Sequence, residues 1–477
     1  MTFNSVPYLV LLAVAVLVHW MLPPRFRKAF VFVVSVAFYG SWGIVFVWLP
    51  LLVAGIVFAI GRQITLDPVA TKTWVRFGIT CLLGLLILFK YRQFVLSNLI
   101  LIGIPIGAGR TSFVASIAFP AGISFYIFEA IGYLIDLRQG RVKMPSFVDL
   151  CLFFFFWPNI LSGPIVRARE LMPQLSFERV FEAGFVFRGM DRIIWGLVQK
   201  NVVANVLGTW VDRGFVQNGT GIPTTVDGWC LAIAFALQIY FDFAGYSNIA
   251  IGTACLMGVT LPENFRQPYH AGTPAEFWTR WHMTLSRWIR DYLFFPINAR
   301  WKGAPVPLYV SLLAVMALVG LWHGAGWGFM VWGLLHGAYL VVYRMYEVWK
   351  TVRPNWNESI LVSGSWRVLT LMGITAAWVP FRAPTLQKAG TILSSMFCRF
   401  ASGGRYGHPF YALLTLMVAF CVIEPALIRK LGELDERSGG NGLSVFRVVA
   451  RQVAYLFGLL LFLLFDEHNA QFIYSRF

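Results

Sequence analysis

The chain is organised as long apolar runs separated by short polar and basic segments. Residues 1–24, 29–61, 243–262 and 303–343 contain no Asp, Glu, Lys or Arg. A helix that crosses a bilayer core needs about 20 predominantly apolar residues. The other spanning architecture, a closed β-barrel, alternates apolar and polar residues. The pattern therefore predicts an all-α polytopic membrane protein.

Membrane spans are expected where an apolar run is bounded by charged residues, and some segments are expected to be half-spans or re-entrant pieces. No internal repeat or Pro- or Ser-rich linker divides the chain, so we expect one membrane domain covering residues 1–477. The expected segments are 6–22, 29–43, 45–61, 77–101, 114–136, 147–163, 186–207, 228–258, 305–322, 326–346, 366–382, 409–428 and 450–466.

The composition agrees with a membrane location. Hydrophobic residues make up 58% of the chain and charged residues 13%, whereas a soluble domain carries roughly 25% charged residues. The balance excludes soluble, disordered, collagen-like and disulfide-stapled classes. The six cysteines lie in or beside apolar segments without a CxxC pair, which argues against disulfides and zinc sites.

The net charge of +17 comes mainly from basic residues between the apolar segments. Such residues mark cytoplasmic loops and contact anionic lipids, so no nucleic-acid partner is expected. With the basic residues of 25–28, 138–143 and 429–451 inside, both termini are expected outside the cytoplasm. Lys90 and Arg92 fit this scheme poorly, because they fall inside an expected span.

Asp242 is the only formal charge in residues 228–262. A lone carboxylate is costly inside a membrane, so it should face a polar cavity or a partner such as an arginine. Gly245 and Ser247 would allow another helix to approach closely. The sequence leaves two roles open for Asp242, a structural ion pair that joins two helices and a contact with substrate.

A second polar segment follows, and its spacing predicts a helix over 275–294. The pairs Glu276/Arg280 and Arg287/Asp291 stand four residues apart and stabilise such a helix. The segment is too charged to cross a bilayer and too aromatic to be solvated on all sides. We expect it at the membrane interface or in a protein-lined cavity, unless it is a simple surface anchor. One face carries Trp278, Trp281, Leu285, Trp288 and Tyr292.

Three of the seven histidines are candidates for chemistry. His323 stands in Gly-Leu-Trp-His-Gly, His336 follows 13 residues later, and His282 belongs to the aromatic segment. A histidine can take up and return a proton near neutral pH, but a buried histidine can equally be a helix-packing residue. The three lack metal-ligand spacing, and no phosphate-binding loop is present, so neither a metal site nor an ATP-driven pump is expected.

Six segments resemble the membrane-bound O-acyltransferase (MBOAT) family, and more closely its bacterial branch. They are FPAGISFYIFEAIGYLID (119–136), NILSGPIVRARELMPQL (159–175), YFDFAGYSNIAIG (240–252), LPENFRQPY (261–269), EFWTRWHMTLSRWIRDYLFFPIN (276–298) and GLWHGAGWGFMVWGLLHG (320–337).

The resemblance implies a ring of about 11–13 transmembrane helices, with re-entrant or interfacial helices, around a central funnel. It matches His323 to the family's invariant histidine and His282 to its second functional histidine, and leaves His336 structural. It also implies that Asp242 falls near the central cavity.

The activity implied by the resemblance is that of a membrane O-acetyltransferase in the bacterial inner membrane. Acetyl-CoA would be the donor substrate, no cofactor would be permanently bound, and an extracytoplasmic polysaccharide, alginate-like first, would be the acceptor. His323 would remove the acceptor's proton, and His282 would orient the acceptor or stabilise the oxyanion. Further candidates for contacts with donor or acceptor are Asp242, Asn264, Arg266, Arg280, Ser286, Arg287, Arg290 and Trp322.

The C-terminal tail, with Phe472, Tyr474 and Phe477, resembles the aromatic tail of several members of this branch. It would either anchor the terminus or present Tyr474 as an acyl relay to a periplasmic acetyltransferase partner of the polysaccharide biosynthesis machinery. Two other functions stay open at this point. They are a proton-coupled transporter or flippase for a glycan or lipid, and an acyltransferase for a lipid or protein.

Overall fold

In the computed structural model the described residues are 1–104, 119–216, 224–301, 305–353, 359–400, 406–436 and 445–465, and this part of the chain is helical without a strand. Five of its segments are long and apolar enough to cross a membrane, namely Ile44–Leu66, Thr71–Leu101, Thr225–Leu256, Val306–His323 and Ile360–Arg382. Three shorter apolar helices lie at Val6–Met21, His408–Glu424 and Arg451–Leu464. The predicted all-α polytopic membrane fold is thus confirmed.

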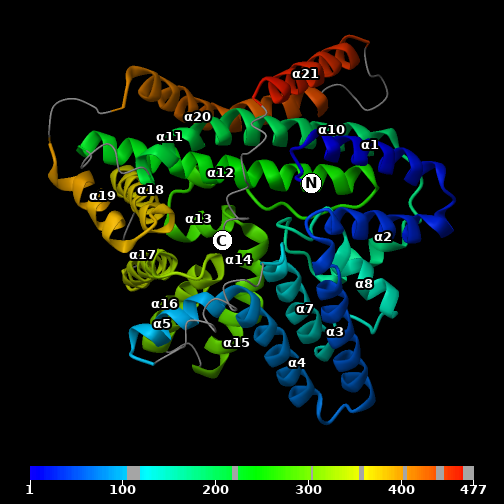
Figure 1. Cartoon of the computed structure of the whole chain (residues 1–477). Coiled ribbons are helices and arrows are strands. Elements are labelled where there is room, and N and C mark those ends of the chain that lie inside the picture. Colours follow the sequence, from blue (N-terminus) through cyan, green and yellow to red (C-terminus); the bar gives the residue numbers. More distant parts are fainter. Residues whose placement is uncertain are drawn as a thin grey trace.

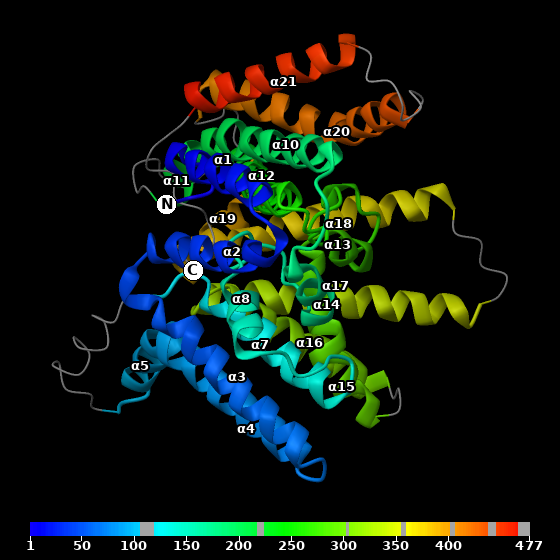
Figure 2. The same cartoon turned by 90° about the vertical axis from the view of Figure 1, so that its right-hand side faces the viewer.

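The first third of the chain forms helices that pack around α7. Helices α3 and α4 both contact α7, and α2 and α3 contact α8. The turn between α3 and α4 lies at the bottom of the molecule in Figures 1 and 2. The elements are α1 (Val6–Met21), α2 (Pro24–Gly40), α3 (Trp48–Leu66), α4 (Thr71–Leu86), the π-helix η2 (Ile87–Tyr91), α5 (Arg92–Leu101), α7 (Ile123–Arg138) and α8 (Phe147–Phe155).

The longest helix of the described residues, α12 (Thr225–Leu256), lies in the interior. It packs along a composite helix that consists of α10 (Ala183–Leu197), the π-helix η4 (Val198–Ala204) and α11 (Asn205–Phe215). It begins at a capping box, in which Thr224 and Asp227 satisfy each other's backbone amides. Outside this pair, α20 and α21 form a further layer (Figure 1). The elements of the outer layer are α20 (His408–Glu436) and α21 (Val445–Leu464), whereas the short α9 (Ala168–Leu171) contacts α7.

The other side of α12 faces short central helices and a bundle of long ones. Helix α16 forms an antiparallel hairpin with α17, and α17 packs against α18. The short α13 and α14 lie near the centre of the molecule in both whole-chain views (Figures 1 and 2). The elements are α13 (Pro274–Arg280), α14 (Met283–Ile289), the π-helix η7 (Arg290–Phe294), α15 (Phe295–Asn298), α16 (Pro305–His323), α17 (Trp327–Thr351), α18 (Ile360–Arg382) and α19 (Leu386–Cys398).

The sequence prediction of a span over 147–163 is wrong in its second half. Helix α8 ends at Phe155, and the chain continues to Val166 as turns and irregular backbone. Non-helical backbone at this depth has to be satisfied by the protein itself. Ser35 Oγ accepts from the Trp157 amide at 3.4 Å, and Glu129 Oε1 accepts from the Val166 amide at 3.1 Å. These acceptors come from α2 and α7, which the local sequence pattern cannot report.

A buried ion pair joins α12 to the composite helix beside it. The Lys200 ammonium pairs with the Asp242 carboxylate, and both side chains are almost fully buried. The seam is close, because a Cβ on Gly245 would lie 2.7 Å from the Gly196 carbonyl oxygen. Of the two environments expected for Asp242, a polar cavity or an ionic partner, the structure thus shows an ionic partner, which is a lysine.

Replacing Asp242 by Asn should destabilise the protein by roughly 3–5 kcal/mol, because Lys200 would keep a buried charge without its counterion. The double variant Asp242→Leu with Lys200→Met should recover most of this loss. Unfolding of the detergent-purified protein measures both, with Glu347→Gln in the exposed Arg344 pair as control. A single variant as stable as the parent would show that the pair does not hold the seam.

Candidate functional site

The predicted helix over 275–294 is interrupted at His282, which corrects the sequence interpretation. His282 adopts a left-handed conformation with φ 41° between α13 and α14. A non-glycine residue in this region is strained unless its surroundings hold it. The Asn264 carbonyl oxygen accepts from the Met283 amide at 2.8 Å, and the Arg280 carbonyl accepts from the Arg266 amide at 2.9 Å. The segment around Asn264 therefore stabilises the interruption between α13 and α14.

The His282 imidazole is fully buried and oriented by the same segment. Asn264 Oδ1 accepts from His282 Nδ1 at 3.0 Å and from Thr284 Oγ1 at 2.9 Å, while Asn264 Nδ2 donates to Ser247 Oγ at 3.1 Å. Because the amide oxygen accepts, Nδ1 carries the proton of the neutral ring. Nε2 is then left as an acceptor, with no hydrogen-bond partner among the described residues.

His323 is the last residue of α16, and the residue is 1% exposed. Its ring centroid lies 4.9 Å from that of Trp322 and 4.9 Å from that of Trp332. The Trp322 ring also lies 6.0 Å from the His282 ring. The structure therefore gathers both predicted catalytic histidines around one tryptophan, although they are 41 residues apart in sequence.

A cavity of about 150 Å³ reaches His323. Its walls come from the C-terminal end of α2, the start of α7, the irregular segment after α8, the π-helix η2 and the end of α16. The residues that line it are Tyr39, Trp42, Gly43, Phe46, Lys90, Phe119, Ala121, Gly122, Ile123, Ser124, Phe125, Leu161, Ser162, Tyr246, Trp322 and His323. We call this space the histidine cavity.

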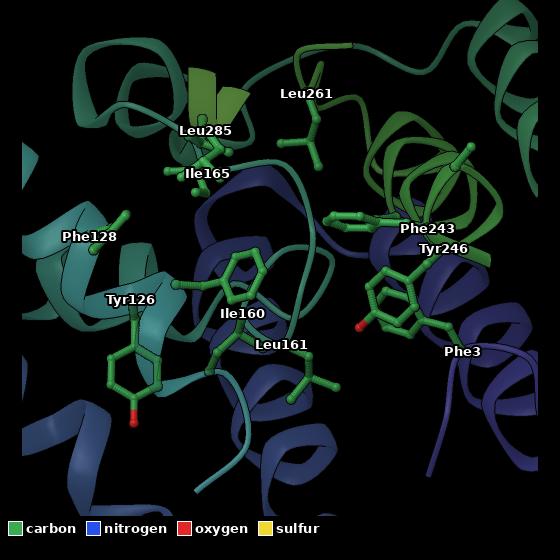
Figure 3. Close-up of a cluster of buried hydrophobic side chains, with 14 of the residues drawn as sticks. Phe3, Tyr126, Phe128, Ile160, Leu161, Ile165, Phe243, Tyr246, Leu261 and Leu285 are labelled. Carbon is green, nitrogen blue, oxygen red and sulfur yellow. The ribbon is translucent and has the colours of Figure 1, made fainter. Parts of the chain in front are cut away.

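The irregular segment after α8 is wedged between α7 and α12. Figure 3 shows Ile160 and Leu161 between Tyr126 of α7 and Tyr246 of α12. The fit is tight at the start of α7, where Gly122 has φ 75° and a Cβ would lie 2.2 Å from the Ile160 carbonyl oxygen. The segment thus forms a fixed wall of the histidine cavity.

A second cavity of about 510 Å³ is open and strongly basic. It lies just beyond the C-terminal end of α7, whereas the histidine cavity lies at its start. Burial alone would raise the pKa of the Asp291 carboxyl, but hydrogen bonds from Arg290 and Arg167 outweigh it and hold the pKa below its ordinary value. The lining residues of this basic cavity are Arg141, Arg167, Arg169, Asp291, Phe295, Pro296 and Ala299.

A column of aromatic rings connects the two cavities, and we call it the aromatic column. It consists of Tyr292, Trp288, Phe128 and Trp322. Arg167 lies over the Tyr292 ring at 5.3 Å, and the Trp288 ring stacks on Phe128 at 4.2 Å. Phe128 in turn stacks on Trp322 at 5.3 Å, beside His323. The direct route from the basic cavity to the histidine is therefore filled by flat side chains rather than by a continuous open passage.

Comparison with known proteins agrees with this architecture. The sequence profile described as MBOAT, membrane-bound O-acyltransferase family, matches residues 90–377. The chain belongs to the membrane-bound O-acyltransferase family. It is therefore an acyltransferase of the membrane, in agreement with the sequence prediction.

Relatives of this MBOAT chain carry several names. It is 34% identical to the probable alginate O-acetylase AlgI of Azotobacter vinelandii over 83% of this chain and 78% of the relative. It is 35% identical to the protein of the same name from Pseudomonas aeruginosa, over 83% and 75%. A peptidoglycan O-acetyltransferase of Helicobacter pylori is 32% identical, over 78% and 74%.

The other predicted contacts of this MBOAT chain have different outcomes. Asn264 and Trp322 touch the histidines, as described above. Asp242 is engaged by Lys200, and Ser286 donates to the Trp281 carbonyl. Tyr474 lies outside the described residues. The four predicted donor-binding arginines line neither cavity; they are Arg266, Arg280, Arg287 and Arg290.

Sequence reasoning did not identify the arginines of the basic cavity as a site, and it assigned no function to Lys90. Arg167 and Arg169 stand within the quoted segment 159–175, so the resemblance contained them. Lys90 was visible only as a charge that did not fit the topology. His336 is buried against Trp278 and Trp332 and does not line the histidine cavity, which agrees with a packing role.

The α16–α17 hairpin that carries His323 depends on glycines. A Cβ on Gly333 would lie 2.1 Å from the Met316 carbonyl oxygen, and a Cβ on Gly320 would lie 2.1 Å from the Phe329 carbonyl oxygen. The two backbones are therefore in direct contact, and neither position has room for a side chain.

Replacing Gly333 by Ala should separate α17 from α16, lower acyl transfer at least tenfold and destabilise the protein by about 1–3 kcal/mol. Gly364→Ala in α18 is the matched control, because no atom lies within 4 Å of its Cβ position. Transfer assays and unfolding of both purified variants give the comparison. Equal behaviour of the two would contradict the assigned helix contact.

Proposed function

We propose that this acyltransferase moves acetyl from acetyl-CoA in the cytoplasm to hydroxyl groups of an extracytoplasmic polysaccharide, with an alginate-like exopolysaccharide as the first candidate. The names of the relatives support both the acetyl group and the polymer. The observation that carries the proposal is the position of His323 on a cavity at one end of α7, with a basic cavity at the other end.

The two cavities lie at opposite ends of α7, and this arrangement indicates which cavity faces which side of the membrane. Helix α7 has 16 residues, which corresponds to roughly 24 Å at 1.5 Å per residue. Basic residues 138–143 lie at and after its C-terminal end, and basic residues 25–28 lie in the first turn of α2, at the end remote from the histidine cavity. The positive-inside rule then assigns the basic cavity to the cytoplasm and the histidine cavity to the opposite side.

The basic cavity suits the donor, because coenzyme A carries phosphate groups. Arginine binds phosphate through several N–H donors at once. Arg169 is exposed, whereas Arg167 and Arg141 are engaged with Asp291 and Asp136. In this proposal Arg169 binds the phosphates of coenzyme A. The thioester arm extends along the aromatic column towards His323 and displaces the rings of the column.

The chemistry requires a base and a place for the negative charge. His323 removes the proton of the attacking hydroxyl as its oxygen bonds to the acetyl carbon, and returns the proton to the departing CoA sulfur. His282 contributes Nε2, its free acceptor, which orients the acceptor hydroxyl. Because both rings touch Trp322, one flat side chain sets their separation.

The later steps belong to the same proposal. The chain acts in a bacterial inner membrane with both termini outside the cytoplasm, alongside a periplasmic acetyltransferase and the polysaccharide biosynthesis machinery. Tyr474 would serve as the intermediate acceptor, taking acetyl on its phenol oxygen and passing it on. Tyr474→Phe tests this step separately from the chemistry at His323.

Replacing His323 by Ala should lower acetyl transfer by about 10²–10⁴-fold, the range for loss of a general base. His336→Gln is the matched control, since it changes a buried histidine of the same hairpin and should leave transfer within a few-fold. Acetyl content of the extracellular polymer and release of CoA thiol from membranes are the measurements. Full polymer acetylation with the His323 variant present in the membrane would remove it from the mechanism.

Replacing Arg169 by Gln should raise KM for acetyl-CoA about tenfold, equivalent to ~1.4 kcal/mol, with kcat unchanged. The KM for S-acetylpantetheine, which has the thioester but no phosphate, should stay the same. Arg344→Gln, in an exposed pair on α17, is the control. If both donors respond equally to the Arg169 variant, the basic cavity does not bind phosphate.

A further inference from the structure

Lys90 is a charged residue in the interior of an apparent membrane span. It lies on the continuous helix from Thr71 to Leu101, which is long and apolar enough to cross the membrane. A lysine at the centre of a spanning helix costs about 2.5–3.5 kcal/mol on insertion scales, so it faces the protein interior and marks function by default. Lys90 lines the histidine cavity together with His323.

The local backbone explains how Lys90 reaches this place. Residues Ile87–Tyr91 form one π-helical turn between α4 and α5. Such a turn contains an additional residue and rotates the side chains that follow, and it is frequent at functional sites. Lys90 and Tyr91 both turn towards the end of α16, where the helix leaves its last carbonyl groups without intrahelical partners.

Both residues bind these carbonyl groups next to His323. Lys90 Nζ donates to the Trp322 carbonyl and, at 3.3 Å, to Ser124 Oγ, and Tyr91 Oη donates to the Leu321 carbonyl at 2.9 Å. Lys90 Nζ also lies 5.6 Å from the Trp322 ring centroid. The end of α16, and with it the His323 backbone, is therefore held by the π-helical turn.

This capping role does not require a positive charge, since Tyr91 performs it with a neutral hydroxyl. Among the described residues no carboxylate forms an ion pair with Lys90, and none lines the histidine cavity. An ammonium group has three N–H donors, of which Ser124 and the Trp322 carbonyl take two. A third N–H donor, with the positive charge of the protonated amine, lies at the wall of the cavity that His323 shares.

We propose that Lys90 is a catalytic residue that donates a hydrogen bond to the acyl carbonyl oxygen and stabilises the oxyanion of the transfer reaction. The inference rests on the proposed acyl transfer at His323. It assigns to the π-helical turn the positive charge that complements the developing negative charge. Within a water-poor cavity such a charge acts far more strongly than it would in water.

The step is balanced without any further reactant. The hydroxyl oxygen forms a bond to the acyl carbon, the carbonyl electron pair moves to oxygen, and the hydroxyl proton moves to His323. The oxyanion accepts a hydrogen bond from Lys90, which keeps its own proton. When the intermediate collapses, the carbon–sulfur bond breaks, the sulfur takes the electron pair, and His323 returns the proton to give the thiol.

The test separates the charge of Lys90 from its capping bond. Lys90→Gln keeps an N–H donor but loses the charge, Lys90→Met loses both, and Lys90→Arg keeps both. Lys72→Met, at the exposed start of the same span, is the matched control. Rates of acetyl transfer and CoA thiol release are measured with membranes containing equal amounts of each protein, over a range of donor concentrations.

We expect Lys90→Met, which loses the donor and the charge, to lower kcat by about 10²–10³-fold, the effect of losing one oxyanion donor, with donor KM changed less than about threefold. Lys90→Gln, which keeps a neutral donor, should lower kcat at least tenfold. Lys90→Arg should exceed Lys90→Gln in kcat at least tenfold. If Lys90→Met fails to accumulate, the comparison of Gln with Arg decides alone.

Two results would overturn the proposal. The first is a Gln variant with a kcat within about threefold of the parent, which would leave Lys90 as a cap. The second is equal loss in the Gln and Arg variants, which would indicate a steric requirement. Failure of the underlying transfer activity is recognised separately, because the parent protein and the Lys72 variant would then release no CoA thiol either.

Discussion

A polar group that this chain carries into the membrane is costly unless the chain itself satisfies it or it faces a cavity, because the hydrocarbon core offers no hydrogen-bond partner. That constraint explains the interior of the structure. Lys200 neutralises Asp242 within the seam between α12 and its neighbour. Glu129 accepts hydrogen bonds from Asn159 and the Val166 amide, which allows irregular backbone beside the histidine cavity. The polar groups of the site are thus supported by polar groups that perform no chemistry.

The sequence predicts the long apolar helices well, because length and hydropathy are local properties. The expected spans 305–322 and 326–346 correspond to α16 and α17 within a few residues. Two breaks were not predicted, the irregular segment after Phe155 and the left-handed residue His282. Each is stabilised by side chains distant in sequence, such as Glu129 for the first and Asn264 for the second. Periodicity within a segment contains no information about such partners.

The candidate site was predictable to the extent that its residues stand in recognisable motifs. His282, His323, Asn264 and Trp322 were named from such segments, and the structure brings them together. The donor-binding arginines were sought on the aromatic segment, but Glu276 and Asp291 engage Arg280 and Arg290 there. Lys90 was overlooked because hydropathy treats a charge within a span as a disturbance of topology. The role of Lys90 can be inferred only from its contact with the Trp322 carbonyl at the end of α16, 232 residues away.

In the proposed transfer of acetyl across the membrane, the aromatic column meets two opposing demands on one protein. The proposal requires the reactants to meet at His323 from opposite sides of the membrane, whereas an open water-filled passage would let ions and protons leak. Stacked rings such as Phe128 and Trp288 close the passage at rest, with the Trp288 indole held by the Phe128 carbonyl at 2.9 Å. Because planar side chains can be displaced by rotation about few bonds, a slender acyl arm can replace them. The seal is then removed only while the donor itself occupies the passage.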